Sequence, residues 1–125
     1  MLLVYHTFTQ QTERVAEVMA DRFTVHGCEV TTAALEFTDP KYSKIFSKWP
    51  MSFPALHIPA LLVPQRRRKT GEIGIPPEAQ EGDYDLVVIG SPTWWLTVNM
   101  PVRSYLKSPA AANALMIFIR FCLKS

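Results

Sequence analysis

The sequence predicts an α/β fold with a parallel sheet, organised as a single domain over residues 1–125. Three observations predict it. Leu2-Leu3-Val4-Tyr5 is a short apolar run typical of a buried parallel strand. A stretch with helical spacing follows from about Gln11 to His26. Leu86-Val87-Val88-Ile89-Gly90 is a second unbroken apolar run, typical of a central parallel strand.

The first 37 residues predict a strand, a helix and a second strand. Apolar side chains recur at helical spacing at Val15, Val18, Met19 and Phe23. We expect Thr9 to be the N-cap of this helix and Gly27 to end it. Residues 28–37 are rich in β-forming side chains and are expected to form the second strand. This is a βαβ unit, so the two strands should be parallel and the crossover right-handed.

The regular pattern is lost over residues 41–83, although residues 41–49 are a candidate short helix. Prolines interrupt this segment, and a basic run, Arg66-Arg67-Arg68-Lys69, lies within it. Structureless stretches of this length inside a domain are often functional or mobile. We expect the basic run to be solvated and to belong to a flexible loop covering the sheet. Contact of residues 56–69 with an anionic membrane surface is the alternative.

After the strand at residues 86–90 we expect a loop at residues 91–95. Asn99 and Pro101 open a predicted helix that runs to about Lys107. Residues 115–121 are a candidate fourth strand, and the tail over residues 110–125 is atypical of the preceding pattern.

Composition excludes several classes of protein. The chain is 48% hydrophobic and 19% charged, which suffices for a core. A net charge of +2 argues against a general nucleic-acid binder. Cys28 and Cys122 form no CxxC motif, which favours reduced thiols in a cytoplasmic protein. We expect no signal peptide and no transmembrane segment.

Two segments carry the candidate chemistry, and the first is Thr7-Phe8-Thr9-Gln10-Gln11-Thr12. It joins the first strand to the first helix, where free N–H groups and the helix dipole favour an anion. The hydroxyls of Thr7, Thr9 and Thr12 can add donors to phosphate oxygens. An ordinary threonine-rich helix cap is the alternative.

The second segment is Ser91-Pro92-Thr93-Trp94-Trp95, at the carboxyl end of the third strand. Ligands of doubly wound sheets bind at this edge, where the strand order reverses. An indole there can stack on a flat ring system. Core or interface packing is the alternative for either tryptophan.

Together these segments resemble the flavodoxin family over residues 2 to about 109. The family's phosphate loop, Ser/Thr-x-Thr-Gly-x-Thr, is similar to Thr7–Thr12, and its second flavin loop is similar to Gly90–Trp95 before a proline-started helix. The resemblance implies a doubly wound parallel sheet of order 2-1-3-4. It implies flavin mononucleotide (FMN) as cofactor, with the phosphate at Thr7–Thr12 and the isoalloxazine along Ser91–Leu96.

The family uses FMN for electron transfer or for flavin-dependent reduction, for example of quinones, so the resemblance implies an electron carrier or an FMN-dependent oxidoreductase. Gln10 stands where the family usually has glycine, so a positive φ there would be strained. No segment is left for a fifth strand, and uncovered apolar surface of this kind predicts a homo-oligomer or marginal stability. The alternative function is a flavodoxin-like scaffold without cofactor, acting as an interaction partner or a degenerate remnant.

Other motifs are set aside. Gly71-Glu72-Ile73-Gly74 matches a bare GxxG, but Glu72 would repel phosphate. The sequence has no GxGxxG and no GxxxxGK[ST]. The three histidines show no metal-ligand spacing, so we expect no metal site. No residue is a convincing acid–base catalyst, although His6 borders the threonine-rich turn.

Overall fold

The computed structural model describes residues 1–40, 42–43, 59, 62–94, 97–112 and 116–121. Its elements, in chain order, are β1 (Leu2–Tyr5), α1 (Gln11–Val25), β2 (Thr31–Ala34), β3 (Glu36–Phe37), β4 (Ile73–Gly74), α4 (Pro77–Glu81), β5 (Val87–Trp94), β6 (Thr97–Val98), α5 (Met100–Leu106), η1 (Pro109–Ala111) and β7 (Met116–Phe121).

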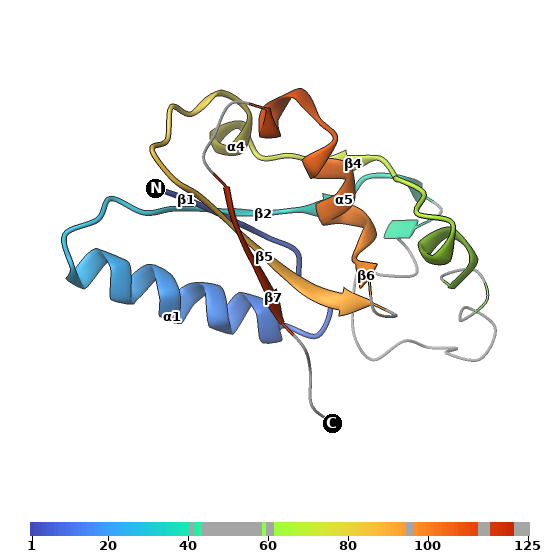
Figure 1. The fold of residues 1–125 in the computed structure, drawn as a ribbon, viewed down its shortest axis with the longest axis horizontal. Helices are drawn as coiled ribbons and strands as arrows, with labels where there is room; N and C mark the ends of the chain where they lie inside the picture. Colours follow the sequence, from blue (N-terminus) through green and yellow to red (C-terminus); the bar gives the residue numbers. More distant parts are fainter. Residues whose placement is uncertain (41, 44–58, 60–61, 95–96, 113–115, 122–125) are drawn as a thin grey trace.

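A parallel sheet organises the chain, as the apolar runs predict (Figure 1). Strand β1 lies between β2 and β5, and Leu2 is opposite Thr31 on one side and Val87 on the other. Strand β7 extends the sheet by pairing in parallel with β5, where Met116 is opposite Val87. Strands β3 and β4 pair antiparallel in a separate two-stranded sheet.

Helices cover both faces of the parallel sheet. Successive side chains of a strand point to opposite faces, which divides β1 between two cores. Leu3 and Tyr5 pack with Ala16 of α1. Leu2 and Val4 pack on the other face, against buried side chains of α4, α5 and η1, namely Ala79, Val102, Tyr105 and Ala111. Figure 1 shows α1 on one side of the strands and α4, η1 and α5 on the other.

Helix α1 agrees with its predicted range, but two details of the prediction are wrong. Its N-cap is Gln10, not Thr9, and no side chain caps the helix. Its buried residues are Thr12 and Ala16, whereas Val18 is 61% exposed. The buried face of α1 therefore does not coincide with its most apolar positions. Gly27 follows the helix with a φ of +85°, which confirms its predicted role in ending it.

The strand containing residues 86–90 is longer than predicted. Strand β5 continues through residues expected to form a loop, and ends at Trp94. The cause is a partner strand: β6 turns back antiparallel, so that Thr93 lies opposite Val98 and Trp94 opposite Thr97. The predicted helix after Asn99 and the strand near residues 115–121 are both present, as α5 and β7.

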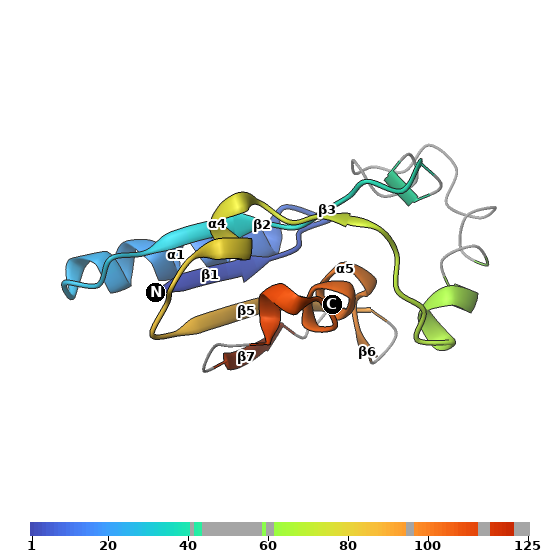
Figure 2. The ribbon, with the colours of Figure 1, turned by 90° about the horizontal axis from the view of Figure 1, so that it is seen from above.

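The described part of residues 41–83 contains a helical turn at residues 62–66, together with β4 and α4. Most of the candidate helix at residues 41–49 lies outside the described residues. Figure 2 shows the turn at 62–66, in green, at the same end of the molecule as β6. In the described part of the chain, no helix is long and apolar enough to cross a membrane.

Candidate functional site

The turn between β1 and α1 lies at the carboxyl edge of the sheet. Thr12 is buried in the first turn of α1, whereas Thr9, Gln10 and Gln11 are exposed. Phe8 is half-buried and packs on a cluster formed by Phe37, Tyr42 and Met100. Phe8 thus anchors the turn, and the exposed residues face solvent at the start of the helix.

Gln10 adopts the left-handed backbone conformation that the family's glycine would favour. Its φ is +62° and its ψ is 0°. This conformation costs about 1–2 kcal/mol for a residue with a Cβ. Because no side chain caps α1, the first N–H groups of the helix remain available to an anion.

The hydroxyl of Thr7 is buried and has no hydrogen-bond partner among the described residues. A buried polar atom without a partner costs about 1–3 kcal/mol. In native proteins such atoms usually form a hydrogen bond with a ligand or an ordered water. The position of Thr7, two residues after β1, fits an oxygen-rich ligand at this edge of the sheet.

The second segment is the end of β5, which extends beyond β1 at the same edge of the sheet. Tyr5 lies opposite Gly90 in the parallel ladder of β1 and β5. Thr7 therefore lies two residues beyond this pair, and Ser91 one residue beyond it. Ser91 is only 1% exposed, and its hydroxyl donates to the carbonyl of Pro92 at 3.1 Å. Trp94 lies in β5, and Trp95 and Leu96 lie outside the described residues.

Asn99 is a candidate site residue that the sequence analysis treated only as a helix opener. It is fully buried, and its Oδ1 accepts a hydrogen bond from the Val102 N–H at 3.0 Å. Its Nδ2 is buried and has no partner among the described residues. Met100, the next residue, belongs to the cluster on which Phe8 packs, so Asn99 lies near the threonine-rich turn. The signal in the sequence was an Asn four residues after Trp95.

His6 precedes the threonine-rich turn and is 3% exposed. Its Nδ1 lies 2.8 Å from the carbonyl oxygen of Leu35, which accepts a hydrogen bond from the ring N–H, and its ring meets Phe37 edge-on with the ring centroids 5.8 Å apart. Burial lowers the pKa of His6, and the hydrogen bond to Leu35 opposes this in part. The imidazole is therefore neutral at pH 7 and adds no positive charge to the turn.

Two side chains hold β6 in place. Gln65 is fully buried, and its Nε2 donates to the Val98 carbonyl at 2.8 Å and to the Thr97 hydroxyl. Arg103 of α5 donates to the same carbonyl at 2.6 Å. Because β6 pairs with Thr93 and Trp94, these bonds fix the hairpin that carries the second candidate segment.

A metal centre has no support in the described part of the chain, where no three His, Cys, Asp or Glu residues gather as ligands would. The turn between β1 and α1 carries hydroxyl and amide side chains, beside the backbone N–H groups at the start of α1. Such groups suit a phosphate ester and a polar ring edge better than a cation.

Comparison with known proteins places the fold. No family model and no curated protein matches the chain. Among solved structures, it is similar to a flavoprotein in complex with FMN from Lactobacillus acidophilus NCFM, with a TM-score of 0.65 and 14% identity, covering 95% of this chain and 90% of that one.

A second similar structure is a protein from Bacteroides eggerthii DSM 20697 that is assigned as a flavoprotein. The TM-score is 0.57 and the identity 19%, covering 95% of this chain and 69% of that one. At these identities the likeness concerns the fold. The chain therefore shares a flavodoxin-like α/β fold with these two proteins, one of which holds FMN.

Proposed function

We propose that this protein binds FMN at the carboxyl edge of its sheet and uses it for electron transfer or for reduction of an acceptor such as a quinone. The phosphate is assigned to Thr7, Phe8, Thr9, Gln10, Gln11 and Thr12. The isoalloxazine is assigned to Ser91, Pro92, Thr93, Trp94, Trp95 and Leu96. The sheet is of the flavodoxin type.

One observation carries the proposal: the Tyr5–Gly90 pairing brings both segments to one edge, where the Thr7 hydroxyl and the Asn99 Nδ2 are buried and have no partner among the described residues. Two unsatisfied donors near an uncapped helix start are costly in an empty protein. A phosphate ester with a polar sugar chain supplies the acceptors that both groups lack.

The residues of the chain bind and orient the cofactor, and the flavin, when bound, supplies the redox chemistry. Backbone N–H groups at the start of α1 and the hydroxyls of Thr7 and Thr12 hold the phosphate without a basic side chain. Gln65 and Arg103 hold the β5–β6 hairpin in position. We assign no acid–base catalyst.

Titration with FMN and with riboflavin tests the proposal. Bound flavin is detected by its own absorbance at ~450 nm and by quenching of its fluorescence. A Thr7→Val variant keeps the shape of the side chain and removes its hydroxyl. We expect this variant to bind FMN about tenfold more weakly, a loss near 1.4 kcal/mol, and to bind riboflavin as the parent does.

The control is Thr32→Val, which alters an exposed threonine of β2 away from the turn. It should change neither affinity. Equal loss of FMN and riboflavin affinity in Thr7→Val would contradict the phosphate assignment. A protein that binds neither flavin would contradict the proposed function.

That last outcome would favour the second candidate, a flavodoxin-like scaffold without cofactor. The observation that favours it is the strained Gln10, since the loop lacks the glycine that this conformation prefers. A colourless protein that gains no thermal stability from added FMN is its signature.

We further propose a cytoplasmic homo-oligomer. Cys28 is an exposed free thiol, which is usual in reducing compartments. Val18 and Val15 of α1 are 61% and 36% exposed on the helix that covers one face of the sheet. Such side chains gain free energy when a second copy covers them. Light scattering coupled to gel filtration measures the mass, and a monomer at micromolar concentration would contradict the oligomer.

A further inference from the structure

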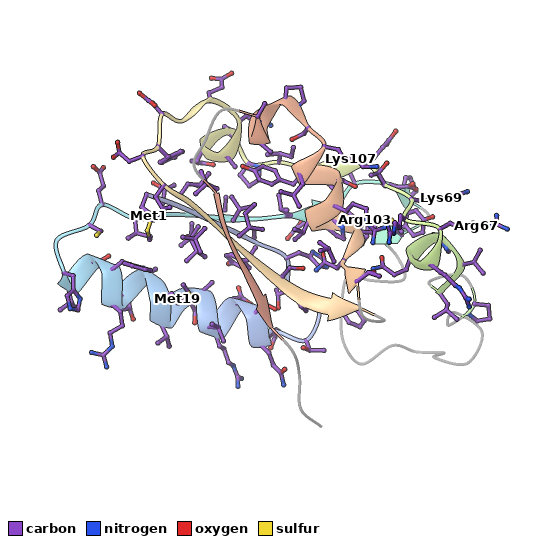
Figure 3. The ribbon with its side chains drawn as sticks, viewed as in Figure 1. Met1, Met19, Arg67, Lys69, Arg103 and Lys107 are labelled. Carbon is purple, nitrogen blue, oxygen red and sulfur yellow. The ribbon has the colours of Figure 1, made fainter. Side chains whose placement is uncertain are left out.

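The basic residues of this nearly neutral chain are concentrated in one place. The protein has 13 Lys and Arg residues and a net charge of +2. Six of the 13 form what we call the basic face: Arg66, Arg67, Arg68, Lys69, Arg103 and Lys107. Figure 3 shows Arg67, Lys69 and Arg103 at the end of the molecule opposite Met1.

Backbone and side-chain contacts join the basic face into one ordered surface. The Lys69 N–H donates to the Pro64 carbonyl at 3.0 Å, which closes the helical turn before it. Arg103 donates to the Lys69 carbonyl at 3.0 Å, which ties the turn to α5. Lys107 lies one helical turn beyond Arg103 on the same face of α5.

The charges of the basic face are not neutralised within the described part of the chain. Residues 66–69 and Lys107 are exposed, and none of the six forms an ion pair with a carboxylate described in the structure. Burial, and then repulsion from Arg68, lower the pKa of Arg103. Like charges held together in this way attract an anionic surface.

Acidic residues lie at the other edge of the sheet. Exposed carboxylates precede β2 and β5, at the amino ends of these strands, and include Glu29, Asp83 and Asp85. The amino and carboxyl ends of parallel strands lie at opposite edges. The basic face, in contrast, lies at the carboxyl edge, where the candidate flavin site also lies.

The basic face contacts the candidate flavin hairpin directly. Arg103 and Gln65 share the Val98 carbonyl as acceptor, and Val98 pairs with Thr93 in the ladder of β5 and β6. A macromolecule that docks on the basic face therefore contacts the segment that we assign to the isoalloxazine. Docking next to a redox cofactor serves exchange of electrons with it.

From this arrangement we propose that the basic face is the docking surface for an acidic redox partner protein. The inference rests on the proposed function, because it needs a flavin at the hairpin. Guanidinium groups bind carboxylates in pairs of hydrogen bonds. The six cations are confined to one turn and one short helix, which suits a bounded acidic patch better than a long polyanion.

Binding of an acidic probe tests the surface without flavin. The probe is a hexaglutamate peptide added to ¹⁵N-labelled protein at low salt. We expect amide shifts at residues 66–69 and in α5. The variant Arg67→Glu/Lys69→Glu should weaken binding at least tenfold. The matched control, Arg14→Glu/Arg22→Glu, reverses two exposed charges on α1 and should weaken it less than twofold.

Three outcomes of that titration overturn the inference: shifts elsewhere or none, equal loss in both variants, or tighter binding of an oligothymidylate or of phosphatidylserine vesicles than of the peptide. The last would assign the face to nucleic acid or to a membrane.

The second test uses the FMN-loaded, two-electron-reduced protein. Each flavin passes its two electrons to two ferricyanide ions, releasing protons to solvent and yielding two ferrocyanide ions. We expect the rate to fall with salt, to drop at least fivefold in Arg67→Glu/Lys69→Glu, and to change little in the α1 control. Hexaamminecobalt(III) should show the reverse salt dependence.

The two tests separate the two proposals. Peptide binding without FMN binding contradicts the proposed function and the redox role of the partner, and leaves an acidic-protein surface. FMN binding with salt-independent, variant-independent ferricyanide rates contradicts the inference and leaves the proposed function.

Discussion

Gln65 donates a hydrogen bond from Nε2 to the carbonyl oxygen of Val98 at 2.8 Å, joining two residues that are 33 positions apart. The bond connects the helical turn at residues 62–66 to the β5–β6 hairpin. The Gln65 side chain is fully buried. An irregular segment of sequence is thereby built into the support of the candidate flavin site.

Replacing Gln65 with Leu should destabilise the protein by about 1–2 kcal/mol, because the buried hydrogen bonds are lost while the volume is kept. The Val98 carbonyl retains its bond from Arg103, which limits the loss. Urea unfolding measures the effect. In Gln80→Leu, which removes an exposed hydrogen bond to the Ile75 carbonyl, we expect less than about 0.5 kcal/mol. A cost for Gln65→Leu no larger than this control would show that the bond does not support the hairpin.

Gln10→Gly should stabilise the empty protein by about 0.5–1 kcal/mol, because glycine adopts a φ of +62° without the clash of a Cβ. Gly27→Ala is the opposite change at a φ of +85°, where an added Cβ meets no atom within 4 Å. It should therefore cost about 1 kcal/mol from backbone strain alone. Chemical denaturation compares the two variants, and the same sign for both would refute the strain assigned to Gln10.

Stability should fall as the pH is lowered below about 6.5, the ordinary pKa of histidine. Burial lowers the pKa of His6 in the folded chain, so between that lowered pKa and 6.5 the unfolded chain binds the extra proton. Stability is thus complete above 6.5 and is lost toward the folded pKa, at no more than about 1.4 kcal/mol per pH unit. Urea titrations between pH 7.5 and 5.5 measure it.

The comparison for that experiment is a pair of variants. His6→Gln should flatten the pH dependence, and His26→Gln, at an exposed position, should preserve it. Parallel curves for His6→Gln and the parent protein would exclude His6 as the titrating group.

Asn99→Ser should leave α5 capped and lower FMN affinity about fivefold to tenfold. Serine supplies a capping oxygen for the Val102 N–H but lacks the Nδ2 donor. Asn99→Ala removes both functions and should in addition cost about 1 kcal/mol of stability. FMN titration together with thermal unfolding separates the roles, and unchanged FMN affinity in Asn99→Ser would remove Asn99 from the site.

The local elements of this fold were predictable where one pattern dominates. The apolar runs at Leu2–Tyr5 and Val87–Ile89 correctly predict parallel strands, because strands buried on both faces need apolar side chains at every position. Gly27 likewise marks the end of α1, because few other residues adopt its backbone angle without strain. The inward face of α1 was not predictable, since Val18 satisfies the helical period and still lies exposed.

By itself, the sequence determined the main elements β1, α1, β5, α5 and β7, the threonine-rich turn and the tryptophan pair, because each depends on residues close together in the chain. Only the tertiary structure decided that Thr7 and Asn99 carry buried donors with no partner in the described part of the chain, and that Gln65 and Arg103 share one carbonyl. These relationships join residues far apart in sequence. Whether a polar group finds a partner depends on what long-range packing brings beside it, and that information is absent from local pattern.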